Sequence, residues 1–168
     1  HVNGGKGCYK LSLTLEQEFR TPIKFYSGQV PKVNNQAIMD NEVFENGKGR
    51  KMTAADVAYS FGRIIDAQTA SPGAWIFNDR IDTLMPFKAV DDTTFELKLI
   101  RPFNPMLGIL SMQYCSVVPH EAVKKWGKDF RSHPCGTGDF RMHDWEEGVV
   151  ITYRKNPDYR EHDREGIP

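Results

Sequence analysis

The sequence lacks an excess of charge of either sign. Its 168 residues contain 22 Lys and Arg against 22 Asp and Glu, so the formal net charge is zero. A protein that binds nucleic acid or an anionic membrane surface through its overall field needs surplus positive charge. We therefore expect no nucleic-acid partner.

Long apolar runs are also missing, because no run approaches the roughly 20 residues that a membrane-spanning helix requires. The first five residues, HVNGG, contain no initiator Met, and no basic stretch followed by an apolar one marks a signal peptide. This start is typical of a processed or excised piece of a longer protein, and we expect the chain to be one.

Cysteine is scarce, with only Cys8, Cys115 and Cys135. An odd number without a CxxC pair excludes a disulfide scaffold. One disulfide with a free thiol and three reduced, mostly buried thiols both remain open. Cys115 and Cys135 flank the same predicted helix and are the candidate pair.

What is present fits a folded domain. Aromatic residues make up 11% of the chain, too many for a disordered segment, and Gly and Pro number 14 and 10, which predicts many turns. A chain of this length buries about 70% of the surface that it exposes when unfolded, so a core needs no disulfide or metal.

The pattern of apolar residues predicts short strands and helices in a mixed α/β (α+β) fold, with helices packed on strands and hairpins. Thr53 and Asp56 have the spacing of a capping box and begin a helix that ends before Ser71. The remaining expected elements are a strand over 9–15, a short strand over 23–26, a hairpin whose turn is 91–93, a helix over 106–110, an interior strand over 115–119, a helix over 121–126, and a second hairpin with strands 140–143 and 149–154.

Three segments of the sequence carry recognisable motifs in a fixed order. They are KMTAADVAYSFGRI (51–64), VPHEAV with WGKDF (118–123 and 126–130), and HPCGTGDF with Trp145 and ITYRKNPDY (133–140 and 151–159). Together these segments resemble the extracellular solute-binding proteins of the peptide/nickel class, family 5. With the elements between them they cover about 120 residues, and residues 1–40 do not match. Asp139 stands where the family usually has Pro, which leaves that peptide more flexible.

The resemblance implies a two-lobed periplasmic-binding-protein fold that encloses a ligand between its lobes. Residues 41–168 would form the first-lobe region, residues 1–40 a poorly assigned N-terminal segment, and the second lobe would lie outside this sequence. It further implies the binding component of an ABC transporter for import. The partners would be a peptide or related small solute and a membrane permease, in a periplasmic or extracytoplasmic location, with a lipoprotein anchor as one form of the full-length protein. Because this chain would supply only one side of the ligand cleft, we expect it to bind ligand weakly or not at all on its own.

The loop after the first helix is the expected ligand contact. Gly73 and Ala74 are followed by Trp75 and Phe77, which bring two large aromatic rings within three residues. In the oligopeptide-binding branch that the sequence resembles, the corresponding loop contributes an aromatic side chain near the ligand, and Gly73 occupies that position here. We expect the role to have moved to Trp75 or Phe77, whose flat rings pack on varied side chains. The alternative is that both rings fill the core.

A second candidate contact is the turn that contains Gly136 and Thr137. Glycines allow backbone N–H groups to face an anion, but the Lys and Ser/Thr of a phosphate-binding loop are missing and a strand follows. The turn therefore directs Phe140 into a sheet. The resemblance places its backbone toward the region between the lobes.

Metal and catalytic motifs are missing. His120, His133, His143 and His162, with Cys115 and Cys135, can all bind zinc, but no two have the short spacing of ligand pairs. No GxSxG or HExxH motif occurs. We expect no metal, no cofactor and no catalytic residue. A metal-dependent hydrolase built on the scattered His, Cys and Asp residues, and an interaction module centred on Trp75, remain the alternatives.

Overall fold

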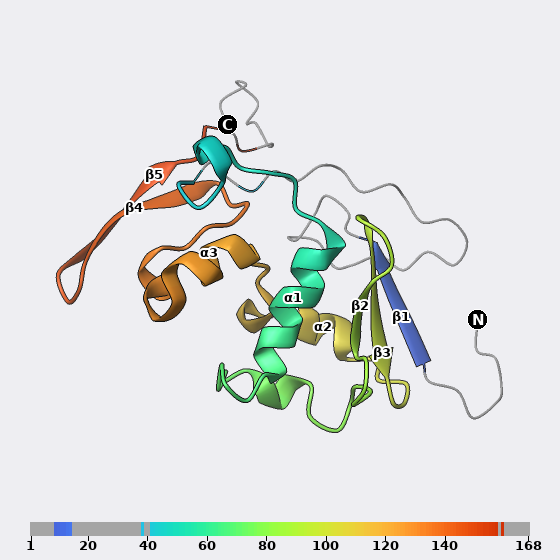
Figure 1. Cartoon of the computed structure of the whole chain (residues 1–168). Coiled ribbons are helices and arrows are strands. Elements are labelled where there is room, and N and C mark those ends of the chain that lie inside the picture. The colour runs from blue at the N-terminus through green and yellow to red at the C-terminus, as the bar shows by residue number, and fades with distance from the viewer. Residues whose placement is uncertain (1–8, 15–37, 39–40, 158, 160–168) are drawn as a thin grey trace, which may run out of the picture. The chain divides into compact units, whose positions relative to one another are not determined.

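A computed structural model of the chain describes residues 9–14, 38, 41–157 and 159 (Figure 1). Backbone contacts divide the chain into two compact units: unit 1 comprises the described residues of His1–Asn34 and Thr53–Val117, and unit 2 those of Asn35–Met52 and Val118–Pro168. The elements in chain order are β1 (Tyr9–Thr14), η1 (Glu45–Gly47), α1 (Ala54–Ile65), η2 (Ala74–Ile76), β2 (Phe87–Ala89), β3 (Thr94–Leu99), α2 (Met106–Leu110), η3 (Gln113–Cys115), α3 (His120–Trp126), η4 (Gly127–Ser132), β4 (Phe140–Glu146) and β5 (Val150–Lys155), where η denotes a 3₁₀ helix.

Unit 1 contains a three-stranded antiparallel sheet in the order β1-β3-β2. Leu97 of the central strand lies opposite Leu11 of β1 and Phe87 of β2. The side chains of Phe95, Leu97 and Leu99 are buried, and those between them are half-buried. The predicted alternation of the hairpin and the predicted N-terminal strand are both confirmed.

Helix α1 packs on β2 and β3 and begins as the sequence predicts (Figure 1). The Asp56 carboxylate accepts hydrogen bonds from the Thr53 backbone N–H at 2.8 Å and from the Thr53 hydroxyl at 3.2 Å. The backbone N–H of Thr53, the N-cap residue, therefore has a hydrogen-bond acceptor. Phe61, on the apolar stripe of α1, contacts the rings of Phe77, Phe87 and Phe95 at centroid distances of 5.7, 5.6 and 5.4 Å. This aromatic cluster forms the core of unit 1.

One predicted element, the strand over 115–119, is wrong. Residues 115–119 do not form an interior strand: Cys115 ends η3, and 116–119 is a connection that belongs to neither of the two described sheets. The backbone N–H of Cys115 bonds to Met112 O at 2.9 Å and that of Ser116 to Gln113 O at 3.2 Å, so local turns satisfy these donors. Pro119 has no N–H with which to join a ladder. The predicted strand over 23–26 lies outside the described residues.

Unit 2 combines α3 and η4 with the antiparallel hairpin β4-β5. Gly127 ends α3 with φ of 53°, a left-handed conformation that suits glycine and confirms the predicted stop. Arg50 joins the segment before α1 to α3, because its Nε and Nη2 donate to Glu121 Oε1 at 2.6 Å and Oε2 at 2.9 Å. At the open end of the hairpin, Asn156 is buried, and its Nδ2 donates to Gly138 O at 2.9 Å.

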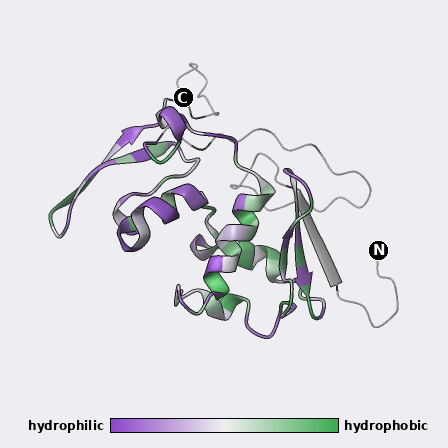
Figure 2. Cartoon of the chain, in the orientation of Figure 1, coloured by the Kyte–Doolittle hydropathy of each residue, from purple (hydrophilic) through white to green (hydrophobic). Residues whose placement is uncertain are grey.

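The hairpin carries apolar side chains on one face. Met142 lies opposite Tyr153, and Trp145 lies opposite Ile151, with an irregularity in register between Met142 and Asp144. Val149 and Val150 add apolar residues beside the turn at the hairpin tip, where green and purple segments meet in Figure 2. None of the helices that the structure describes combines the length and the apolar sequence needed to cross a lipid bilayer.

Candidate functional site

The loop that follows α1 is shaped by consecutive tight turns. Ser71 Oγ accepts a hydrogen bond from the Gly73 N–H at 3.2 Å, and Ser71 O accepts one from the Ala74 N–H at 3.1 Å. The 3₁₀ helix η2 continues the turn, since Ile76 N–H donates to Gly73 O at 3.1 Å and Phe77 N–H to Ala74 O at 3.2 Å. Local hydrogen bonds thus fix the backbone on both sides of Trp75.

Gly73 allows this loop to lie directly against Tyr114. A Cβ atom added at Gly73 would come within 2.7 to 2.8 Å of three carbon atoms of the Tyr114 side chain. Such a distance is shorter than carbon atoms adopt, so the close approach requires the absence of a side chain. Tyr114 lies 41 positions along the chain, and nothing in the sequence pattern indicated this contact.

The predicted aromatic pair divides between surface and core. Half of the Trp75 side chain is exposed, at 50%, whereas Phe77 is 1% exposed and Ile76 is fully buried. Phe77 packs in the aromatic cluster, with its ring centroid 5.1 Å from that of Phe87. Trp75 is therefore the large aromatic side chain that this loop exposes, and ligand contacts by Trp75 and Phe77 both stay predictions.

The second predicted contact, Gly136 and Thr137, belongs to unit 2, whereas the Trp75 loop belongs to unit 1. Both residues are half-buried in a bend that follows the buried Cys135. A Cβ atom at Gly136 would meet no atom within 4 Å, so this glycine is not required by a close contact. The bend leads directly into β4 at Phe140, as expected from the turn.

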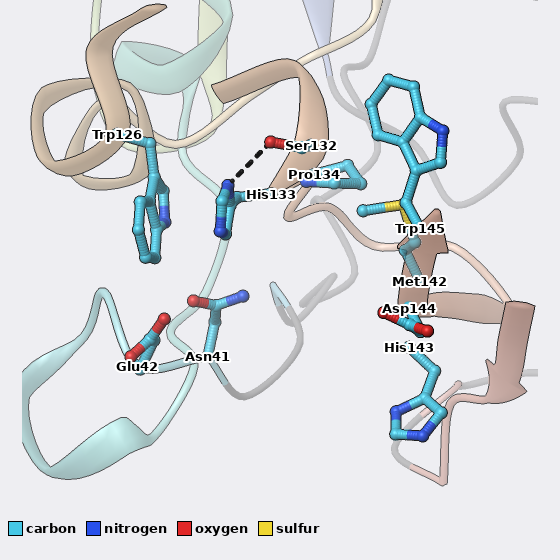
Figure 3. Close-up of a pocket in the computed structure, with 10 residues that line it drawn as sticks. All are labelled: Asn41, Glu42, Trp126, Ser132, His133, Pro134, Met142, His143, Asp144 and Trp145. Atoms are coloured by element: carbon cyan, nitrogen blue, oxygen red, sulfur yellow. Dashed lines mark hydrogen bonds between the residues drawn. The ribbon is translucent and has the colours of Figure 1, made fainter. Parts of the chain in front are cut away.

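Unit 2 contains an open pocket with a volume of about 400 Å³ (Figure 3). On one side His133 stacks on Trp126, with ring centroids 3.7 Å apart and an angle of 13° between the planes. The sequence indicated these residues as family motifs but gave no sign that they line a pocket. The lining consists of Asn41, Glu42, Trp126, Ser132, His133, Pro134, Met142, His143, Asp144 and Trp145.

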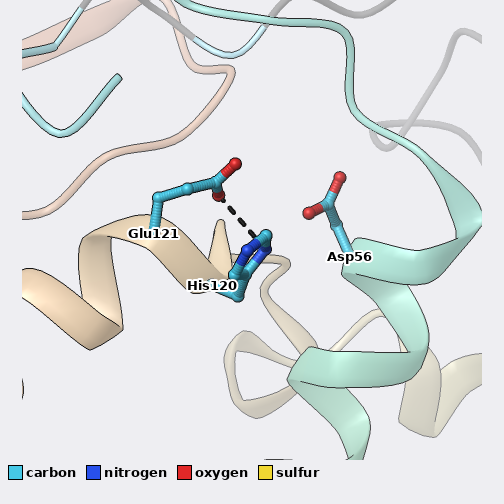
Figure 4. Close-up of side chains that lie close together, drawn as sticks. All are labelled: Asp56, His120 and Glu121. Carbon is cyan, nitrogen blue, oxygen red and sulfur yellow. Dashed lines mark ion pairs between the residues drawn. The ribbon is translucent and has the colours of Figure 1, made fainter. Parts of the chain in front are cut away.

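Two of the histidines considered as metal ligands, His120 and His133, are held in local contacts, and His143 lines the pocket. His120 Nδ1 lies 3.3 Å from Glu121 Oε2 (Figure 4), and His133 Nδ1 lies 3.1 Å from both Ser132 Oγ and Asp129 O. Cys115 and Cys135 are not joined in a disulfide, and burial raises the pKa of each thiol to about 11. A neutral, buried thiol is a poor metal ligand and nucleophile. Cys8 and His162 lie outside the described residues.

Comparison with known proteins identifies sequence relatives. A family model described as bacterial extracellular solute-binding proteins, family 5 Middle, matches residues 38–166. The periplasmic oligopeptide-binding protein OppA of Salmonella typhimurium is 32% identical over 134 residues, which cover 68% of this chain and 24% of that protein. The glutathione-binding protein GsiB of Salmonella typhi is 28% identical over 81 residues, or 48% of this chain and 15% of GsiB.

Solved structures give the same result. The substrate-binding domain of an oligopeptide ABC transporter from Bacillus anthracis superposes with a TM-score of 0.61 at 25% identity, covering 67% of this chain and 24% of that one. DppA from Helicobacter pylori, in complex with the peptide STSA, gives a TM-score of 0.61 at 25% identity over 77% of this chain and 27% of DppA. The chain thus spans about a quarter of the length of these proteins. It belongs to the bacterial extracellular solute-binding proteins of family 5.

Proposed function

We propose that this chain is part of the substrate-binding component of an ABC importer that takes up peptides or a related small solute outside the cytoplasmic membrane. The observation that carries the proposal is the family match over residues 38–166. Relatives that bind oligopeptides, the peptide STSA and glutathione support a peptide-like ligand. The permease of the same transporter would be its protein partner.

The ligand contact that we propose is the Trp75 loop. Trp75 is half exposed, and Gly73 and Ala74 precede it on backbone that local hydrogen bonds hold in place. An indole ring offers a wide apolar surface with few rotatable bonds, which suits contact with side chains of varied shape. Backbone hydrogen bonds to an extended peptide would supply the affinity that does not depend on sequence. We propose the backbone of Gly136 and Thr137 as a further contact.

A binding role without catalysis agrees with the site chemistry. Burial keeps Cys115 and Cys135 protonated at neutral pH, which argues against a thiol nucleophile at either position. His133, the histidine of the third family segment, is stacked on Trp126. We therefore propose that the protein is not an enzyme.

Native mass spectrometry tests the proposal on the protein as its own cells produce it. We expect an added mass that fragments into amino-acid residues, and we expect a W75A variant to lose most of it. R101M, which alters an exposed residue after β3, should retain the ligand. Stoichiometric zinc in place of an organic ligand would instead favour a metal-dependent hydrolase.

Calorimetry with the 168-residue chain gives a second test. The chain spans about a quarter of the length of its relatives, so we expect it to bind a peptide such as Ala-Phe-Ala only weakly or not at all. Micromolar affinity of the chain alone would contradict the expectation that most of the binding surface is missing from it.

A further inference from the structure

The side chain that holds the Trp75 loop in place is Arg80. Its Nη1 donates to three backbone carbonyls of the loop: Trp75 O at 3.0 Å, Ile76 O at 3.2 Å and Asn78 O at 3.2 Å. A hydrogen bond from a charged donor to a carbonyl is stronger than a neutral one. A single guanidinium nitrogen is thus hydrogen-bonded to three backbone carbonyls of the segment that contains Trp75.

Arg80 is itself anchored at both its backbone and its side chain. Ile100 N–H donates to Arg80 O at 2.9 Å, and the adjoining residue, Ile81, forms a bridge with Leu99 at the end of β3. The guanidinium carbon lies 5.0 Å from the centroid of the Phe103 ring, a cation–π distance. Arg80 therefore connects the loop to the sheet.

The rest of the loop leaves Trp75 with little freedom of its own. Ile76 and Phe77 directly after it are buried in the core, and Gly73 before it lies against Tyr114. The backbone at Trp75 is held by its neighbours on both sides and by the hydrogen bond from Arg80 to its carbonyl, while the residue itself is half exposed. An exposed aromatic ring on fixed backbone loses little entropy when it binds.

From this geometry we propose that Arg80 is the positioning residue that fixes the backbone from which the Trp75 indole is presented for ligand contact. The expected effect of Arg80 on binding rests on the proposed function. The positioning itself is a property of the ligand-free protein and can be tested without a ligand. A lysine cannot replace it fully, because the ammonium of Lys ends one atom short of the Arg Nη1 position.

Fluorine NMR of the chain with 5-fluorotryptophan at its three tryptophans tests the positioning without a ligand. A W75F variant identifies the Trp75 resonance. In R80M we expect this resonance to broaden and move toward its position in denaturant, while those of Trp126 and Trp145 stay unchanged. R101M is the matched control, and it should leave the Trp75 resonance in place.

An unchanged Trp75 resonance in folded R80M would overturn the proposal. If R80M does not fold, R80K decides. We expect folded R80K to shift the Trp75 resonance part of the way, and an unchanged resonance in that variant would overturn the proposal equally. Thermal unfolding followed by circular dichroism establishes which variants are folded.

Binding of Ala-Phe-Ala to the protein as its own cells produce it separates this proposal from the proposed function. We expect R80M to weaken binding by about tenfold, as loss of a well-placed aromatic contact does. In a W75A background the same substitution should change nothing further. An equal loss in both backgrounds would overturn a role through Trp75. Unchanged binding in W75A would refute the proposed ligand contact of Trp75. The fluorine NMR result would then decide alone whether Arg80 positions Trp75.

Discussion

His133 stacks on Trp126 with ring centroids 3.7 Å apart and nearly parallel planes. The two residues come from different segments of the family motif, one at the end of α3 and the other after η4. In this contact the imidazole covers the indole and lies within hydrogen-bond distance of Ser132. The histidine of this motif thus packs within unit 2, where it also lines the pocket.

Removal of this stack should destabilise unit 2. We expect H133A to lower the free energy of unfolding by about 1 to 2 kcal/mol, the range for loss of a stacked aromatic pair and its buried area. H133F keeps an aromatic ring over Trp126 and should lose less than half as much. Urea denaturation followed by tryptophan fluorescence measures both. Equal losses in H133A and H133F would show that the polar contacts of His133 matter more than the stack.

The pair of Arg50 with Glu121 should contribute more to stability than an ion pair of the same chemistry on the surface. The side chains of Arg50 and Glu121 are 32% and 25% exposed, against 66% and 72% for Arg131 and Glu147. We expect R50M to cost about 1 to 2 kcal/mol, because a half-buried carboxylate loses two charge-assisted hydrogen bonds.

The matched control is R131M, which should cost at most about 0.5 kcal/mol, since solvent screens an exposed pair. Denaturant unfolding of the two variants side by side gives the comparison. If R131M proves as destabilising as R50M, burial is not what distinguishes these pairs.

The close approach of Gly73 to Tyr114 can be tested with alanine. G73A places a Cβ atom 2.7 Å from the Tyr114 ring, and we expect a loss of about 1 to 3 kcal/mol, typical of overpacking. G62A adds the same methyl group in α1, where no atom lies within 4 Å, and should stabilise by about 1 kcal/mol through helix propensity. A G73A protein as stable as G62A would mean that Tyr114 moves aside freely.

The sequence was sufficient where local signals agree with burial. The capping pair Thr53 and Asp56, the alternation at Phe95 and Leu97, and the glycine stop at Gly127 each predict an element from a few neighbouring residues, and each element is present. The prediction of a strand over 115–119 was wrong, because an apolar stretch that ends in Pro119 is equally compatible with an extended connection outside a sheet.

The candidate site was harder to predict, because its geometry depends on contacts distant in sequence. From the sequence, Trp75 and Phe77 are equally good candidates for a ligand contact. Only the packing of Phe77 against Phe61 and Phe87 shows that its side chain belongs to the core. Neither Tyr114 nor the side chain of Arg80 carries a motif that connects it with the loop. Such contacts follow from the fold as a whole, which local patterns do not specify.

Stability should fall in acid through Asp82. Backbone N–H groups of Met85 and Leu84 and the Lys98 ammonium lower the pKa of this carboxyl to about 2. A carboxyl with a pKa lowered on folding stabilises above its unfolded value of 3.8, and this contribution disappears as the pH falls from about 4 to about 2. The D82N protein should therefore lose less stability than the native chain over that interval. Chemical denaturation at several pH values measures the slopes, and equal slopes would contradict the assignment to Asp82.

Cys115 and Cys135 should not react in the folded protein. Burial raises the pKa of both thiols to about 11, so at pH 8 only about one thiol in a thousand is ionised even where reagent can reach it. We expect a C8S variant to show no fast reaction with a disulfide reagent under native conditions, and two reactive thiols in denaturant.

Cys115 and Cys135 have no disulfide to protect them, so slow labelling in native buffer reports how often each unit opens. In the C8S background, C135A leaves Cys115 to report the opening of unit 1, and C115A leaves Cys135 to report the opening of unit 2. A fast reaction in native C8S would contradict the burial of the thiol concerned, and identical rates in both single variants would indicate that the units open together.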